Sequence, residues 1–157
     1  MYKSIFIMLC VMAFAALAAP DSNAQTARTS VRASEINGTF RHSFPAKFKR
    51  SSSDIKIWAL GHGKIKIAFD LIYPHLDGNG DLTANTGEGG GEATISGDTA
   101  VYESAKFGPC KITITFVRPG TIKVDQDGTD TDCGFGHDVT ANGVFRKISS
   151  AKPKFGS

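Results

Sequence analysis

The clearest candidate for chemistry is a run of oxygen-bearing side chains in the middle of the chain. Between residues 77 and 88 they occupy positions 1, 3, 5, 7, 9 and 12 of an EF-hand calcium loop, namely Asp77, Asn79, Asp81, Thr83, Asn85 and Glu88. This spacing predicts a Ca²⁺ site, because the ion prefers a cage of oxygen ligands. Other features favour a flexible connection between two strands instead. Leu82 stands where the EF-hand needs Gly, and Pro74 and the run 89–91 stand where helices should flank the loop.

A second acidic cluster lies near the C-terminal end. Four carboxylates occur within eight residues, at Asp125, Asp127, Asp130 and Asp132. Such groups repel one another unless they spread into solvent or a cation neutralises them. The Asp127-Gly128 pair is also a turn signal, so we expect a solvated loop here.

The sequence offers little support for catalysis. His42, His62, His75 and His137 share no motif with a serine or a free cysteine. There is no nucleophile elbow and no metalloprotease helix. We therefore expect a protein that is not an enzyme and that needs no cofactor other than, in the EF-hand interpretation, Ca²⁺.

The N-terminus has the pattern of an export signal. Lys3 precedes an apolar run over 5–19, which is too short to span a bilayer comfortably. Small residues allow cleavage after Ala18 or after Ala24, and we favour Ala24, which makes 1–24 a signal peptide. The remaining chain would be periplasmic or secreted, with no membrane span.

Three cysteines leave one pair in the exported chain. Cys10 lies in the segment expected to be removed, while Cys110 and Cys133 remain. An even count in an oxidising compartment predicts a disulfide, which would stabilise the fold by roughly 3 kcal/mol. A metal site is a weaker alternative, because neither cysteine has neighbours that would supply further ligands.

The charges are unevenly distributed along the chain. Residues 25–66 contain nine bases against two acids, and residues 67–138 contain twelve acids against four bases. We expect solvated faces of one domain, with attraction of an acidic partner as the alternative. No nucleic-acid recognition motif accompanies the basic stretch, so no nucleic-acid partner is expected.

Period-two alternation predicts an all-β fold. In Lys64–Leu71 the apolar side chains of Ile65, Ile67, Phe69 and Leu71 share one face, and the polar ones share the other. Short turn sequences such as Gly61-His62-Gly63 separate such runs. We predict about eight antiparallel strands in a meander, at 36–42, 54–60, 64–72, 92–96, 99–104, 110–117, 121–126 and 143–148.

The first and last predicted strands carry matching hexapeptides. Asn-Gly-Thr-Phe-Arg-His begins at Asn37, and Asn-Gly-Val-Phe-Arg-Lys begins at Asn142. Two equivalent strands would meet side by side and remove the exposed edges of the sheet. We therefore predict a small closed or nearly closed barrel over 36–148, with a flattened sandwich as the alternative. Residues 25–35 are expected to form a flexible N-terminal arm, and 149–157 a short basic tail.

Several segments together resemble a group of small exported bacterial proteins of unknown function. They include residues 84–93, Ala100-Val101-Tyr102, Cys110–Ile114, Gly143–Lys147 and the Asp-Cys-Gly-Phe-Gly element over 132–136. The resemblance covers most of 84–154. It implies an exported protein in which the two cysteines pair.

A shorter stretch is similar to a family of known activity. Ser96-Gly97-Asp98-Thr99-Ala100-Val101-Tyr102 matches the Ser-Gly-x-x-x-x-Tyr element of periplasmic C-type lysozyme inhibitors, which are also eight-stranded barrels. In that family the loop enters the lysozyme cleft, so Ser96 and Tyr102 are the contacts that the resemblance implies. The family's second element, which contains Trp and Lys, is absent from this chain.

Three classes of function therefore remain. The first is a non-enzymatic exported binding module that acts on a protein of the cell envelope, with lysozyme inhibition as its concrete form. The second is a barrel that holds a small apolar ligand in its mouth. The third is a structural domain stabilised by calcium.

Overall fold

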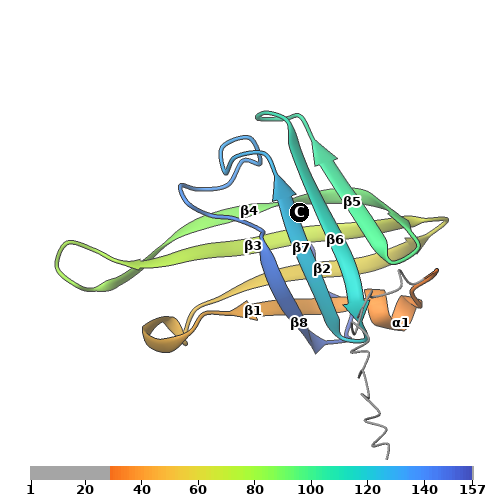
Figure 1. Cartoon of the computed structure of the whole chain (residues 1–157), viewed down its shortest axis with the longest axis horizontal. Helices are drawn as coiled ribbons and strands as arrows, with labels where there is room; N and C mark the ends of the chain where they lie inside the picture. Colours follow the sequence, from red (N-terminus) through yellow and green to blue (C-terminus); the bar gives the residue numbers. More distant parts are fainter. Residues whose placement is uncertain (1–28, 157) are drawn as a thin grey trace, which may run out of the picture.

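The alternating runs form eight antiparallel strands, each hydrogen-bonded to the next, and the last strand returns to the first to close a barrel (Figure 1). The computed structural model describes residues 29–156. In chain order the strands are β1 (Gly38–Ser43), β2 (Ser52–Gly61), β3 (Lys64–Leu76), β4 (Leu82–Ser96), β5 (Thr99–Ser104), β6 (Cys110–Arg118), β7 (Thr121–Asp127) and β8 (Gly143–Ser149). The predicted all-β meander and its closure into a barrel are confirmed.

Large apolar side chains fill the interior of the barrel. Phe40, Phe116 and Phe145 come from β1, β6 and β8, and each is at most 2% exposed. The Phe40 and Phe116 rings meet edge to face, with their centroids 6.3 Å apart. Isoleucines from the other strands complete the core, including Ile57 of β2 and Ile122 of β7. A ligand on the barrel axis would have to displace these side chains.

The barrel closes where the two matching hexapeptides meet. Strands β1 and β8 pair antiparallel, with Arg41 opposite Arg146. Each hexapeptide begins with an asparagine that binds the strand on its other side. Asn37 Oδ1 accepts the Ala59 N–H of β2 at 2.6 Å, and Asn142 Oδ1 accepts the Gln126 N–H of β7 at 2.6 Å. The sequence match therefore reflects a shared local structure.

Both hexapeptides place glycine directly after this asparagine. Gly38 has a φ of 138° and Gly143 a φ of 147°. Residues with a side chain rarely adopt such values, so glycine is required at the start of both strands.

The two ends of the barrel are covered by different segments. Residues 128–142, which connect β7 to β8 and which we call the lid, cover one end. There Phe135 packs against Phe69 with ring centroids 6.0 Å apart. The short helix α1 (Ala33–Ile36) covers the other end, where Ile36 is 6% exposed and Val31 packs on the core.

Helix α1 is fixed to the last strand by a lysine. The Lys147 ammonium donates to the backbone oxygens of Ser34 and Asn37, both at 2.8 Å. Burial lowers the pKa of Lys147, and the nearby Glu35 carboxylate opposes this shift.

The central hairpin differs from the prediction. Strands 64–72 and 92–96 were expected, with a flexible connection between them. Instead β3 and β4 pair continuously from Lys64 opposite Thr94 to Leu76 opposite Leu82. The connection is reduced to a turn at 77–81, and the hairpin extends well beyond the barrel wall (Figure 1).

The structure describes part of the predicted N-terminal arm and most of the predicted basic tail. The predicted signal peptide and residues 25–28 lie outside the described residues. The remainder of the predicted flexible arm includes α1, which is packed on the barrel. Of the predicted tail, Ser149 ends β8, and the following residues return across the outer face of the barrel. There the Lys66 ammonium lies 5.1 Å from the Phe155 ring and the Lys152 ammonium lies 5.5 Å from the Trp58 ring.

Within residues 29–156, no helix has the length and apolar composition needed to cross a membrane.

Candidate functional site

The six oxygen-bearing residues of the EF-hand register lie along the hairpin and are not gathered around one point. Asp77, Asn79 and Asp81 lie in the turn, whereas Thr83, Asn85 and Glu88 lie on strand β4. Glu88 lies seven positions after Asp81 along extended chain, which corresponds to about 23 Å. A single ion cannot contact both ends of such a span.

The turn itself is organised by one of these carboxylates. Asp77 Oδ1 accepts the backbone N–H groups of Asp81 and Asn79, both at 2.9 Å. These hydrogen bonds lower the pKa of Asp77, because they favour its charged form. The acidic residue that opens the EF-hand pattern thus stabilises the tip of the hairpin.

The part of the hairpin beyond the barrel, residues 73–85, is called the arm. Its end carries a directly opposed leucine pair, Leu76 and Leu82, which are 44% and 49% exposed. Side chains of an opposed pair lie on the same face of the ribbon, and residues of odd number lie on the other face. On that other face Tyr73 is 41% exposed and its ring stacks on His75 with a centroid separation of 5.8 Å. Both faces of the arm therefore present apolar surface to solvent.

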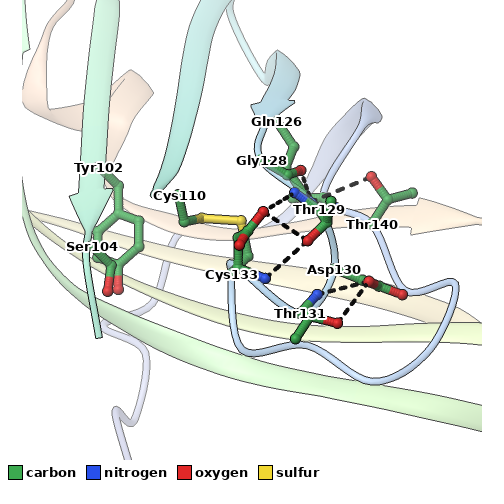
Figure 2. Close-up of a disulfide and its surroundings, with 12 residues drawn as sticks. Tyr102, Ser104, Cys110, Gln126, Gly128, Thr129, Asp130, Thr131, Cys133 and Thr140 are labelled. Carbon is green, nitrogen blue, oxygen red and sulfur yellow. Dashed lines mark hydrogen bonds between the residues drawn. A yellow bond between two sulfur atoms is a disulfide. The ribbon is translucent and has the colours of Figure 1, made fainter. Parts of the chain in front are cut away.

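The predicted disulfide is present. Cys110 at the start of β6 is bonded to Cys133 in the lid, and Figure 2 shows the bond linking these two elements. Gln126 fixes the far end of the lid, since its Oε1 accepts the Ala141 N–H at 2.8 Å. The lid is therefore held at both ends, covalently near its start and by hydrogen bonds near its finish.

Two of the segments that resemble the small exported bacterial proteins contact each other where the lid packs on β4. The Gly136 N–H donates to the Thr86 carbonyl at 3.0 Å, and the Asn85 side chain donates to the His137 carbonyl at 2.7 Å. Phe135 and Val139 also pack over Gly87 of β4. The Asp-Cys-Gly-Phe-Gly element is thus the part of the lid that seals against β4.

The second acidic cluster lies at the end of β7 and in the lid. Its Asp130 carboxylate accepts the backbone N–H groups of Asp138 and Thr131, both at 2.7 Å, and these bonds lower the pKa of Asp130. Asp132 Oδ2 accepts the N–H and hydroxyl of Thr129 at 3.0 and 2.7 Å, which likewise lowers the pKa of Asp132. These two acids hold the lid backbone in shape.

One group of side chains in the lid has the composition of a metal site. Ligand atoms of Asp130, His137 and Asp138 lie within 4.8 Å of one another. Both oxygens of Asp130 already accept backbone hydrogen bonds, and the His137 side chain is 85% exposed. The arrangement is what a solvated, hydrogen-bonded loop produces without an ion.

An open hollow of about 610 Å³ lies beside the disulfide, between the lid and the β5–β6 connection. Three acids and one base line it: Glu103, Asp127, Asp132 and Lys111. The Lys111 ammonium lies 4.0 Å from Glu103, and both side chains are more than half exposed. The hollow is therefore open to solvent and lined by charged side chains.

Ser96 and Tyr102 do not form one contact surface. Ser96 is exposed at the tight turn between β4 and β5, where it pairs with Thr99. Tyr102 lies three residues further along β5, its ring centroid is 5.5 Å from that of Phe69, and its hydroxyl donates to the Gly90 carbonyl at 3.3 Å. It helps to close the gap between β4 and β5.

Sequence reasoning missed the exposed apolar residues of the arm. The available signal was the pattern around the Asp77–Asp81 turn, because leucines at 76 and 82 are placed symmetrically about it. Opposed residues flanking a tight turn are typical of a hairpin.

The chain was compared with known protein families, with characterised proteins and with solved structures, and none of these comparisons found a match.

Proposed function

We propose that this protein is an exported, non-enzymatic binding module that uses the arm to bind a protein partner. The observation that carries the proposal is the exposed apolar surface on both faces of the arm. Isolated two-stranded hairpins are marginally stable in water, and contiguous exposed apolar surface marks sites of protein association. A ribbon that is apolar on both faces fits a groove whose walls cover it from two sides.

The rest of the molecule supports this type of function. Side chains fill the barrel interior, which makes the mouth of the barrel a poor site for a small ligand. The disulfide fits an oxidising compartment, and the apolar segment at the N-terminus suggests that the chain reaches the periplasm or the medium through a signal peptide.

The experiment compares two double variants in affinity capture from the exported proteins of the source cells. Leu76→Ser with Leu82→Ser removes the leucine pair of the arm. Val144→Ser with Ile148→Ser is the matched control, since these β8 residues are 49% and 50% exposed. We expect the arm variant to weaken binding of a partner captured by the native protein by roughly 10- to 100-fold, because central apolar residues dominate such interfaces. The control should bind normally. Equal binding by both variants would contradict the proposal.

The resemblance to lysozyme inhibitors names one partner that deserves a direct test. Ser96 is exposed at a tight turn, as a residue that enters a cleft must be. If lysozyme is the partner, excess protein will slow cell-wall hydrolysis, and Ser96→Ala will relieve the inhibition. Unchanged lysozyme rates at saturating protein would exclude this partner and leave the arm proposal standing.

A further inference from the structure

The connection between β1 and β2 carries a concentrated positive charge. Lys47, Lys49 and Arg50 occur within four residues and are all exposed. We call residues 44–51 the basic loop, and it projects beyond the ends of β1 and β2 (Figure 1). Throughout residues 29–156, these three cations have no carboxylate within ion-pair distance.

Other cations on the barrel wall have acidic partners. The ammonium groups of Lys64, Lys111 and Lys123 lie 3.5, 4.0 and 2.8 Å from Glu92, Glu103 and Asp125, respectively. Arg41 forms a bidentate pair with Asp54, with both N–O distances at 2.7 Å. Four strand cations also lack an ion pair within residues 29–156, but they are spread over β2, β3, β6 and β8: Lys56, Lys66, Arg118 and Arg146. The basic loop differs from the strands in concentrating three such cations within four residues.

Two phenylalanines lie among these cations. Phe44 and Phe48 are both partly exposed. The Phe44 ring meets His42 edge to face with centroids 5.1 Å apart, and the Lys47 ammonium lies 5.1 Å from the Phe48 ring centre. The loop thus presents cations together with aromatic surface, a combination that suits the interface between water and a bilayer.

The backbone of the basic loop is held in one conformation. A 3₁₀ turn, η1 (Ala46–Phe48), forms its centre, with the Phe48 N–H donating to the Pro45 carbonyl at 3.1 Å. The Ser51 N–H donates to the Phe48 carbonyl at 2.8 Å. Ala46 has a φ of 50°, a left-handed value that costs energy for a residue with a side chain. The cations are therefore displayed on an ordered turn.

We propose that the basic loop docks the protein on the surface of an anionic phospholipid bilayer. The lipid phosphates would neutralise Lys47, Lys49 and Arg50, and the Phe44 and Phe48 rings would enter the headgroup region. Each cation near such a surface contributes about fivefold in binding, so three contribute roughly 100-fold. This proposal is independent of the arm and its partner.

The test measures partition onto vesicles of phosphatidylglycerol mixed with phosphatidylcholine, at low ionic strength. The loop variant is Lys47→Gln with Lys49→Gln and Arg50→Gln. The control is Lys64→Gln with Lys111→Gln and Lys123→Gln, which removes the same charge from cations that have acidic partners. We expect the loop variant to lose roughly 100-fold in partition and the control to lose only a few-fold. Vesicles of phosphatidylcholine alone should bind none of the proteins strongly.

Two results would overturn the proposal. One is equal loss in both triple variants, which would show that net charge and not the loop governs binding. The other is failure of the native protein to bind the anionic vesicles. Thermal melting of each variant verifies that the barrel remains folded.

A final comparison separates a bilayer from other polyanions. Phe48→Ser should weaken partition onto anionic vesicles severalfold, because it removes an aromatic ring from the interface, while leaving binding to double-stranded DNA unchanged. If Phe48→Ser has no effect on vesicle binding, or if native protein binds DNA as tightly as it binds vesicles, the loop is a general polyanion site and the assignment to a membrane is wrong.

Discussion

Glycine in the outer part of β4 serves packing more than flexibility. At Gly87 a Cβ atom would lie 2.8 Å from Val139 Cγ1 and 2.9 Å from Phe135 Cβ, both in the lid. Real Cβ atoms do not approach other carbons so closely, so only glycine lets the lid seat on the strand. Two residues further along, a Cβ at Gly89 would meet its nearest neighbour, Phe135 Cε1, at an ordinary 3.5 Å.

These two glycines make a matched pair for substitution. Gly87→Ala should destabilise the protein by about 1–3 kcal/mol, because the lid must shift to relieve the overlap. Gly89→Ala should change the free energy of unfolding far less, since no neighbour has to move. Urea unfolding of both variants measures the difference. Equal midpoints for the two would mean that the lid does not rest on β4 as described.

At the scale of the strand, the hexapeptides begin with two asparagines that have the same role. Each side chain accepts a backbone N–H of the neighbouring strand, but the two hydrogen bonds differ in their exposure to solvent. The hydrogen bond from Ala59 N–H to Asn37 Oδ1 is partly buried, whereas the one from Gln126 N–H to Asn142 Oδ1 is exposed. Water replaces a lost partner only at the exposed site, so the same substitution should have different costs.

We expect Asn37→Ala to lower the free energy of unfolding by about 1–2 kcal/mol and Asn142→Ala to lower it by less than about 1 kcal/mol. Hydrogen exchange at the Ala59 and Gln126 amides should accelerate in the respective variant. The effects should add in the double variant, because the two asparagines share no partner. A larger loss of unfolding free energy in Asn142→Ala than in Asn37→Ala would show that solvent exposure of the hydrogen bond does not determine the cost of removing it.

The strands differ in how much of them local sequence predicts. In β3 the alternation over residues 64–71 predicts a strand, because the inner face is apolar and the outer face is charged. The same rule fails for residues 82–91, where Gly, Asn and Thr dominate and neither face is apolar. That part of β4 is extended because it pairs with β3 across the hairpin and supports the lid, and the lid residues come from a distant part of the chain.

The cysteine pair and the lid show the same contrast. The bond between Cys110 and Cys133 follows from counting cysteines in an exported chain, and the closure of the barrel follows from the repeated hexapeptide. The packing of Phe135 over Gly87 depends on how the lid crosses β4, and no local sequence pattern predicts that crossing. The arm was missed for a related reason, and the charge count over 25–66 did not single out the basic loop, because the importance of both lies in what remains exposed once the barrel is closed.

The whole molecule is a filled barrel that is covered at both ends, and this determines which ligands it accepts. The lid and α1 cover the two openings, and side chains such as Ile114 and Phe116 occupy the space between them. The native interior therefore has no room for a small apolar molecule unless a core side chain is made smaller. Substituting Ile114, which is 0% exposed, by alanine should create a cavity at a cost of about 2–5 kcal/mol.

The native protein should therefore leave its core methyl NMR signals unchanged when benzene is added, whereas Ile114→Ala should show saturable shifts, because dry apolar cavities of this kind accept such molecules. Shifts in Ile114→Ala would also show that the measurement can detect bound benzene. Saturable shifts in the native protein would instead mean that the interior opens to ligands. The binding function would then have to be sought inside the barrel, and the exposed arm would no longer be its best-supported location.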